Sequence, residues 1–152
     1  MTRPLAAAAV ALVLLVAGCG DDDDGSAAGA AGVVVSDAWA RSTPPGVDVG
    51  VVYVTVTSAT GDRLVRAEVA PSVADHVEMH RTLESDGMTS MEPVDSLAVP
   101  AGGELVLAPL GDHLMLVGLA APLTSGTSFE VTLHFATAGD QVVEVEVRDD
   151  AP

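Results

Sequence analysis

Short runs of alternating hydrophobic and polar residues begin at Val33 and continue almost to the end of the chain, separated by Gly, Pro, Asp and Ser. Alternation with a period of two is typical of strands that bury one face. The clearest predicted strands cover residues 49–58, 64–69, 73–81, 104–108, 113–119, 129–136 and 142–147. No long stretch of helical periodicity competes with them. The pattern therefore predicts an all-β domain, a β-barrel or sandwich, whose core is mainly Val and Leu.

The N-terminal residues predict export and lipidation. Arg3 precedes an apolar run over residues 5–16, which is short for a membrane span. The run ends in Val16-Ala17-Gly18-Cys19, which matches the lipobox of bacterial lipoproteins, where the cysteine receives the lipid. We interpret residues 1–18 as a signal peptide and Cys19 as the lipidation site. The alternative is a plain secretory peptide in which the cysteine is incidental.

The predicted organisation has one folded domain. Residues 19–32 hold the anchor cysteine, an Asp run and then small residues, a composition that favours a flexible tether. Residues 33–148 form the predicted β domain, and residues 149–152 a short tail. We therefore expect a lipid-anchored protein of the cell membrane on its extracytoplasmic side, either periplasmic or on the outer face.

The net charge and the motifs of the sequence disfavour several classes of function. The formal net charge is -16, with six Arg and no Lys, so contacts with nucleic acid or an anionic membrane surface are disfavoured and the membrane is reached through the anchor only. The sequence contains no Ser-His-Asp or Cys-His arrangement and no phosphate-binding glycine loop, so we predict that the protein is not an enzyme. Trp39 is interpreted as a core residue, and Asp62 with Arg63 as a turn or a structural ion pair.

Four His and five Met are the candidate metal ligands. His113 and Met115 lie two apart in a predicted strand, so their side chains share a face. His80 ends another predicted strand, and Met91 follows the hairpin-like residues 84–87, which can bring it back beside His80. Thioether sulfur combined with imidazole suits Cu(I) better than Zn, Mg or Ca. Taken singly, each of these residues is more often a core or surface residue, and Met79 is predicted to be core.

The spacing of these residues resembles a known ligand motif. Ten residues separate His80 from Met91, twenty-one separate Met91 from His113, and one more precedes Met115. This spacing is similar to that of the periplasmic copper A chaperone (PCuAC) family, and the resemblance extends over about residues 33–147. The landmarks that carry it are Asp37-Ala38-Trp39-Ala40-Arg41, Pro44-Pro45-Gly46, Tyr53, Asp62-Arg63-Leu64, Val77-Glu78-Met79-His80, Pro100-Ala101-Gly102-Gly103, Gly111-Asp112-His113-Leu114-Met115-Leu116 and residues 119–123.

The resemblance implies a cupredoxin-like β-barrel or sandwich that binds one Cu(I) ion through His80, Met91, His113 and Met115. It also implies a chaperone that supplies copper to the copper A centre of respiratory oxidase, alone or with another assembly factor. Some members carry a C-terminal His- and Met-rich extension for a second copper, which this sequence lacks, so one ion is expected.

Two alternatives stay open at this point. A copper storage or resistance lipoprotein would use the same ligands and differ only in the acceptor of the metal. A surface β-sandwich that binds no metal would leave the ligand spacing as coincidence. An electron-transfer cupredoxin is disfavoured, because blue-copper sites need a cysteine thiolate and Cys19 is assigned to the lipid.

Overall fold

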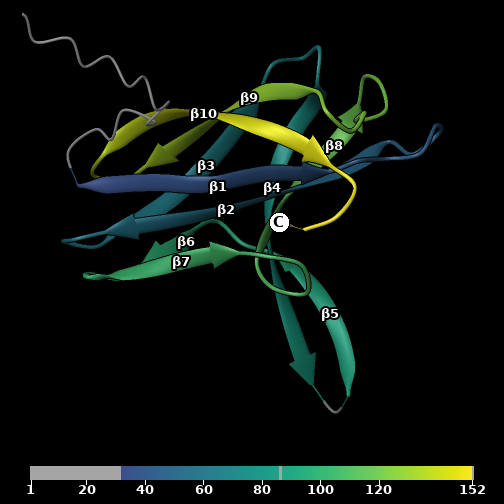
Figure 1. Cartoon of the computed structure of the whole chain (residues 1–152). Helices are drawn as coiled ribbons and strands as arrows, with labels where there is room; N and C mark the ends of the chain where they lie inside the picture. The colour runs from purple at the N-terminus through teal and green to yellow at the C-terminus, as the bar shows by residue number, and fades with distance from the viewer. Residues whose placement is uncertain (1–31, 86, 152) are drawn as a thin grey trace, which may run out of the picture.

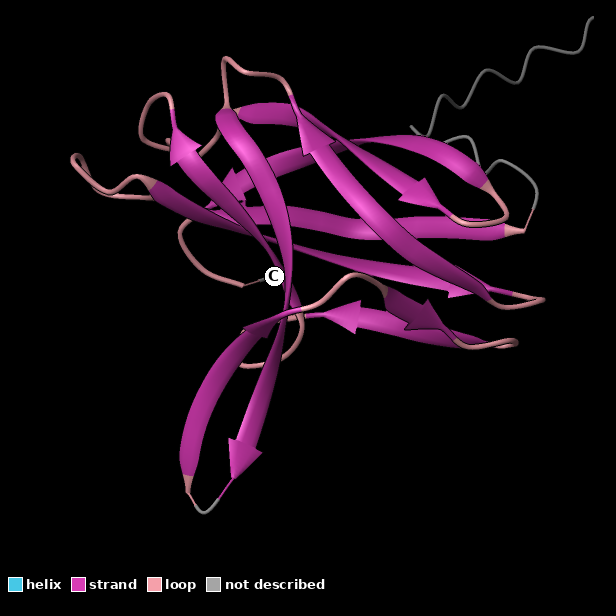
Figure 2. Cartoon of the chain, turned by 180° about the vertical axis from the view of Figure 1, so that it is seen from behind, coloured by secondary structure: helices cyan, strands magenta, loops and turns pink. Residues whose placement is uncertain are grey.

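The computed structural model describes residues 32–85 and 87–151, and over these ranges the chain forms ten strands and no helix (Figure 2). The strands are β1 (Val33–Arg41), β2 (Val49–Ser58), β3 (Asp62–Val69), β4 (Ala74–Ser85), β5 (Met88–Pro93), β6 (Leu97–Val99), β7 (Gly103–Leu107), β8 (His113–Leu119), β9 (Ser128–Phe135) and β10 (Gly139–Arg148). None of the described residues lies in a helix long and apolar enough to cross a membrane. The signal peptide, Cys19 and the tether before Gly32 fall outside the described residues.

The strands pair in the order β5-β4-β8-β2-β1-β10-β9-β3-β6, and β7 also pairs with β2. The β1–β10 pair is parallel and the other pairs are antiparallel. Strand β3 also contacts β4, although the two are far apart in the pairing order, so the sheet folds back over itself around one core (Figure 1). The all-β sandwich predicted from the alternation is confirmed.

The core is aliphatic, as the composition requires. The side chains of Leu64, Leu97, Leu114, Leu116 and Leu133 are fully buried, and valines from five strands surround them. Burying a leucine side chain stabilises the fold by about 1.5–3 kcal/mol. The alternation that produces this burial is clearest in β10, where every second residue points inward. The core therefore follows from the period of the sequence.

The structure also shows the roles of Trp39 and Asp62. Trp39 is buried and packs on Tyr53 with ring centroids 4.7 Å apart, which confirms its predicted core role. Of the two structural roles predicted for Asp62 with Arg63, a turn or an ion pair, the ion pair is not formed, and Asp62 binds backbone at the start of β3. Its carboxylate accepts backbone N–H groups of Arg63, Thr137 and Ala138 at 2.7–3.0 Å, whereas the guanidinium of Arg63 donates to the hydroxyl of a serine at 2.8 Å.

The predicted strand boundaries hold best for two strands that pair with each other. Residues 49–58 and 113–119 match β2 and β8, while the other predicted strands differ by a few residues at their ends. Strands β1, β5 and β6 were not among the clearest predicted strands. In β1 the alternation is interrupted by a bulge between Ser36 and Trp39, and Asp37 there has a φ of 51°. All residues of β5 are exposed, and β6 has three residues, so neither gives a periodic signal.

One hairpin leaves the body of the domain. Strand β4 pairs with β8 only as far as the pair His80–His113, whereas its pairing with β5 continues to Ser85 and Met88. Beyond His80, β4 therefore pairs with β5 alone, and the two form a projecting arm (Figure 1). We call residues 81–85 and 88–92 the arm. Its base coincides with the two predicted histidine ligands.

Candidate metal centre

Strand register brings the four predicted ligands to one face of the sheet. His80 lies directly opposite His113 across β4 and β8, and Met91 lies opposite Thr82 across β5 and β4. Directly opposed residues share a face, as do residues two apart on one strand, so Met115 joins His113 on this face. The two imidazole rings have centroids 5.6 Å apart. The hairpin that was expected to return Met91 toward His80 is confirmed, with Met91 one diagonal step away.

Hydrogen bonding determines which nitrogen His113 presents. The Nδ1 atom of His113 lies 3.0 Å from the carbonyl oxygen of Gly111. A carbonyl can only accept, so Nδ1 carries the proton and Nε2 keeps its lone pair in the neutral ring. The same carbonyl accepts the hydroxyl of Thr82 at 2.7 Å. His113 is buried, so this tautomer is held in a sheltered position.

His80 presents the other type of nitrogen. Its Nε2 lies 2.9 Å from a carboxylate oxygen of Glu78, so in the neutral ring Nε2 donates and Nδ1 keeps the lone pair. That Nδ1 is buried and has no hydrogen-bond partner. A buried acceptor without a partner costs about 1–3 kcal/mol, a cost that coordination to a metal ion would remove. The orphaned nitrogen fits a metal ligand.

Glu78 links two histidines on this face. Its second carboxylate oxygen accepts from Nε2 of His76 at 3.2 Å. The hydrogen bonds from His80 and then from His76 hold the pKa of Glu78 below its usual range. The carboxylate therefore stays ionised and orients His80, an arrangement common behind metal-ligating histidines. His76 itself is exposed and contacts Glu78, the carboxylate that holds the proposed ligand His80.

The two methionines differ in exposure. Met115 is half-buried between β4 and β2, opposite Glu78 and Val51. Met91, on the arm, is 62% exposed. The site is thus enclosed on the side of the two imidazoles and open on the side of Met91. Met79 points the other way and is buried, which confirms that it belongs to the core.

This donor set has a definite chemical preference. It combines two neutral imidazole nitrogens with two neutral thioether sulfurs, and soft donors of this kind favour Cu(I). Among the residues that the structure describes, no group of three or more His, Cys, Asp or Glu is placed to hold a metal ion. For example, both ring nitrogens of His134 are hydrogen-bonded to carboxylates: Nε2 lies 2.9 Å from Glu68, and Nδ1 lies 2.7 Å from Asp140. The thioethers are what distinguish the face of β4 and β8.

From the sequence, Glu78 was named only among the landmarks of the family resemblance, and Thr82 was not named at all. Glu78 could have been recognised as a partner of His80, because two residues on one strand share a face. Thr82 gave no signal, since its hydrogen-bond partner Gly111 is twenty-nine residues away in the sequence. Such pairings depend on register, which the sequence alone does not specify.

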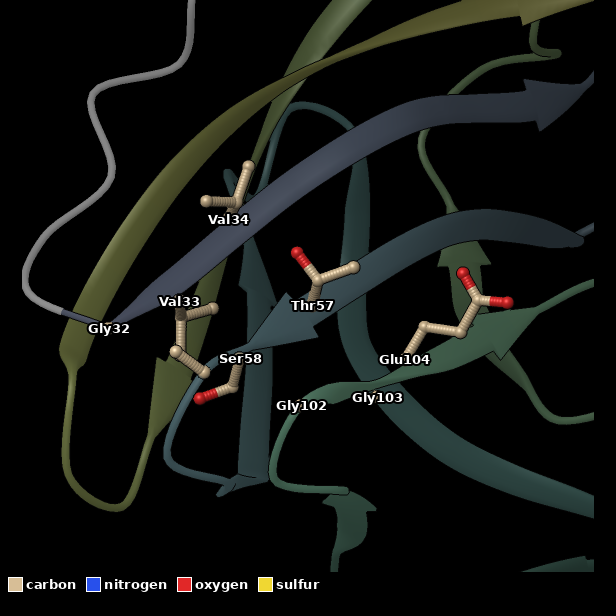
Figure 3. Close-up of a pocket in the computed structure, with 9 residues that line it drawn as sticks. Gly32, Val33, Val34, Thr57, Ser58, Gly102, Gly103 and Glu104 are labelled. Carbon is tan, nitrogen blue, oxygen red and sulfur yellow. The ribbon is translucent and has the colours of Figure 1, made fainter.

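An open hollow of about 720 Å³ lies elsewhere, at the far ends of β1, β2 and β7. Figure 3 shows Val33, Val34, Thr57, Ser58 and Glu104 around it. Its lining contains neither imidazole nor thioether. Thr57 is six residues along β2 from Val51, the neighbour of Met115, which is about 20 Å at the rise of a strand. The hollow is therefore separate from the ligand face.

Comparison with known proteins shows the family to which the domain is similar. The family model described as "Putative lipoprotein LpqE-like" matches residues 33–147. A protein of Leifsonia xyli subsp. xyli named "Putative lipoprotein Lxx21020" is 36% identical over 119 residues, covering 78% of this chain and 70% of that protein.

Solved structures agree on the fold. The copper-bound PCuAC domain from PmoF2 superposes with a TM-score of 0.64 at 22% identity, covering 78% of this chain and 93% of that one. The solution structure of CuI-DR1885 from Deinococcus radiodurans superposes with a TM-score of 0.61 at 31% identity, covering 81% and 84%. The predicted resemblance and the cupredoxin-like fold are confirmed. The chain belongs to the family described as "Putative lipoprotein LpqE-like", and its fold is that of PCuAC domains.

Proposed function

We propose that the protein is an extracytoplasmic Cu(I) carrier that holds one ion through His80, Met91, His113 and Met115. The observation that carries the proposal is that each of the two imidazoles has one ring nitrogen held by an oxygen acceptor, which leaves the other nitrogen for a metal. Gly111 leaves Nε2 of His113 free to bind, Glu78 leaves Nδ1 of His80 free to bind, and both rings share a face with two thioethers.

The ligand set also suits a carrier. Neutral imidazole and thioether ligands add no charge of their own, and a site without thiolate releases Cu(I) to an acceptor with stronger ligands. The open side at Met91 supplies a route for that transfer. Cu(I)-bound and copper-bound structures among the similar proteins support the choice of metal. Here copper is cargo, and the residues of the chain bind, orient and release it.

The cellular location and the copper acceptor that we propose are those expected from the sequence. Cys19 would anchor residues 33–148 to the membrane through the tether 19–32, in agreement with the lipoprotein naming of the family and its relative. The acceptor we propose is the copper A centre of respiratory oxidase. Storage or resistance is the second candidate, and it differs from delivery only in whether an acceptor draws the metal out.

A Cu(I) titration of the purified chain against a colorimetric Cu(I) chelator tests the site. We expect about one ion per chain, and a loss of at least tenfold in affinity for Met91→Leu and for Met115→Leu, since each removes one soft ligand. Met88→Leu is the matched control, because Met88 is exposed on the same strand and is outside the proposed ligand set. Wild-type affinity in both ligand variants would rule out the quartet.

Incubating the Cu(I)-loaded chain with an apo copper A domain separates the two candidate roles. Delivery predicts that copper leaves the chain and appears in the acceptor. Retention of Cu(I) by a chain that binds it tightly would support storage or resistance instead.

A further inference from the structure

One of the four proposed ligands stands on a different part of the fold from the other three. His80, His113 and Met115 lie on the paired segments of β4 and β8. The fourth, Met91, lies on the arm. Backbone pairing between β4 and β8 ends at His80 and His113, so it does not extend to the arm. An ion bound to all four ligands would therefore join the arm to β8 across a boundary that backbone pairing does not cross.

Few side chains attach the arm to the body of the domain. The hydroxyl of Thr82 donates to the carbonyl of Gly111 at 2.7 Å on the ligand face. On the opposite face of β4, the guanidinium of Arg81 approaches the carboxylate of Asp112 at 3.4 and 3.5 Å, and it is partly exposed, so this ion pair adds little. Among the described residues, no other side chain of the arm makes a hydrogen bond or an ion pair with the body.

Strand β5 has a strand on one side only. It pairs with β4 over its whole length and forms one edge of the sheet, and all of its residues are exposed. Segments with few buried contacts open at a low free-energy cost. The ladder between β4 and β5 is unbroken, so the arm would move as one unit about its base, where Val94 N–H donates to the carbonyl of Met79 at 2.8 Å.

We propose that the arm is a clasp controlled by copper: it swings away from β8 in the apoprotein, and Cu(I) holds it at the ligand face through Met91. The proposal deepens the proposed function and rests on it. The three ligands on the body bind the ion first, and Met91 completes the site as the arm closes. Because the closed arm gains a Cu–S bond that the open arm lacks, Cu(I) shifts the population toward the closed state.

His80 gives an independent reason for two positions of the arm. It is the last residue of β4 that pairs with β8, and its buried Nδ1 has no hydrogen-bond partner. A buried acceptor without a partner is costly. A bound ion removes that cost when the arm is closed, and water admitted at the base of the arm removes it when the arm is open. The unpartnered nitrogen thus favours an open arm without copper and a closed arm with it.

Release of copper reverses the order of binding. As the arm opens, the Cu–S bond to Met91 breaks, and its electron pair returns to the sulfur. The ion stays Cu(I), and it keeps the three ligands of the body until a ligand of the acceptor takes the vacated position. Met91 is the most exposed of the four ligands, so the exchange begins where an acceptor can approach.

The distance between two spin labels tests the clasp. The labels are placed at Ser90→Cys on the arm and Val142→Cys on β10, two exposed positions, in the purified full chain with Cys19→Ser. About 10 Å of strand separate Ser90 from the base of the arm, so a swing of the arm displaces its label. Pulsed dipolar EPR should give a broad distance distribution without metal and a narrower, shifted one with Cu(I), which is diamagnetic and does not perturb the labels.

Two methionine variants separate the clasp from the mere loss of a ligand. Each removes one thioether, and each is measured at a Cu(I) concentration that loads it fully. Met91→Leu should leave the distribution as broad with Cu(I) as without it. Met115→Leu is the matched control, and its distribution should narrow as in the original chain, because Met91 is intact.

The failure of the clasp and the failure of the proposed function are distinguishable. A distribution that narrows equally in Met91→Leu overturns the clasp, and so does one that Cu(I) leaves unchanged in the fully loaded original chain. A distribution that stays broad in fully loaded Met115→Leu overturns it as well. If the original chain binds no Cu(I), the proposed function itself is refuted.

Discussion

Thr82→Val removes one hydroxyl from the base of the arm and preserves the shape of the side chain. In the folded chain that hydroxyl donates to Gly111 at 2.7 Å, and the same carbonyl accepts from Nδ1 of His113 at 3.0 Å. The substitution therefore removes one of the contacts that hold the loop to β4, leaving that of Arg81 with Asp112, and loosens the group that selects the His113 tautomer. The threonine acts through another residue and is a positioning residue.

The expected magnitude follows from these contacts. One partly buried hydrogen bond contributes about 0.5–1.5 kcal/mol to the free energy of unfolding. Partners behind metal ligands commonly alter affinity about 10–100-fold, and we expect the lower end here, since His113 keeps its bond to Gly111. Urea unfolding gives the stability, and competition with a Cu(I) chelator gives the affinity.

A spectroscopic readout separates positioning from general loosening. In the apoprotein, ¹⁵N chemical shifts of His113 should report a proton on Nδ1, and Thr82→Val should shift the population toward a proton on Nε2. Thr82→Ser keeps the hydroxyl and should restore both the tautomer and the affinity. Unchanged shifts and affinity in Thr82→Val would refute the role given to this residue.

Three further predictions concern stability and pH. Asp62→Ala should lower the free energy of unfolding at pH 7 by about 1.5–3 kcal/mol, because backbone N–H groups outweigh the effect of burial and lower the pKa of Asp62. That contribution is present above the pKa in the unfolded chain and is lost as pH falls through the folded-state pKa, so urea unfolding at pH 7 and pH 3 should show the variant and the original converging in acid. Leu114→Ala should cost about 2–5 kcal/mol, since its side chain is fully buried behind the ligand face, and equal unfolding midpoints would contradict that packing. Cu(I) affinity should decline on acidification as protons compete for Nδ1 of His80 and Nε2 of His113, which chelator competition across a pH series checks.

The sequence predicted the body of the domain because burial imposes a period of two on strands such as β2 and β10. It also predicted that His113 and Met115 share a face, since this needs only one strand. The exposed strand β5 was not among the clearest predicted strands, because none of its residues is buried and its sequence therefore lacks the alternation of a strand that faces the core. Register explains the rest: the pairing of Met91 with Thr82, and the contact of Thr82 with Gly111, depend on how distant strands align.

X-ray absorption at the copper edge of the Cu(I)-loaded chain tests the central claim most directly. The account predicts a first shell that contains sulfur from Met91 and Met115 together with nitrogen from His80 and His113, and loss of part of the sulfur signal in Met91→Leu. A first shell of nitrogen and oxygen without sulfur, or a sulfur signal unchanged in that variant, would contradict it.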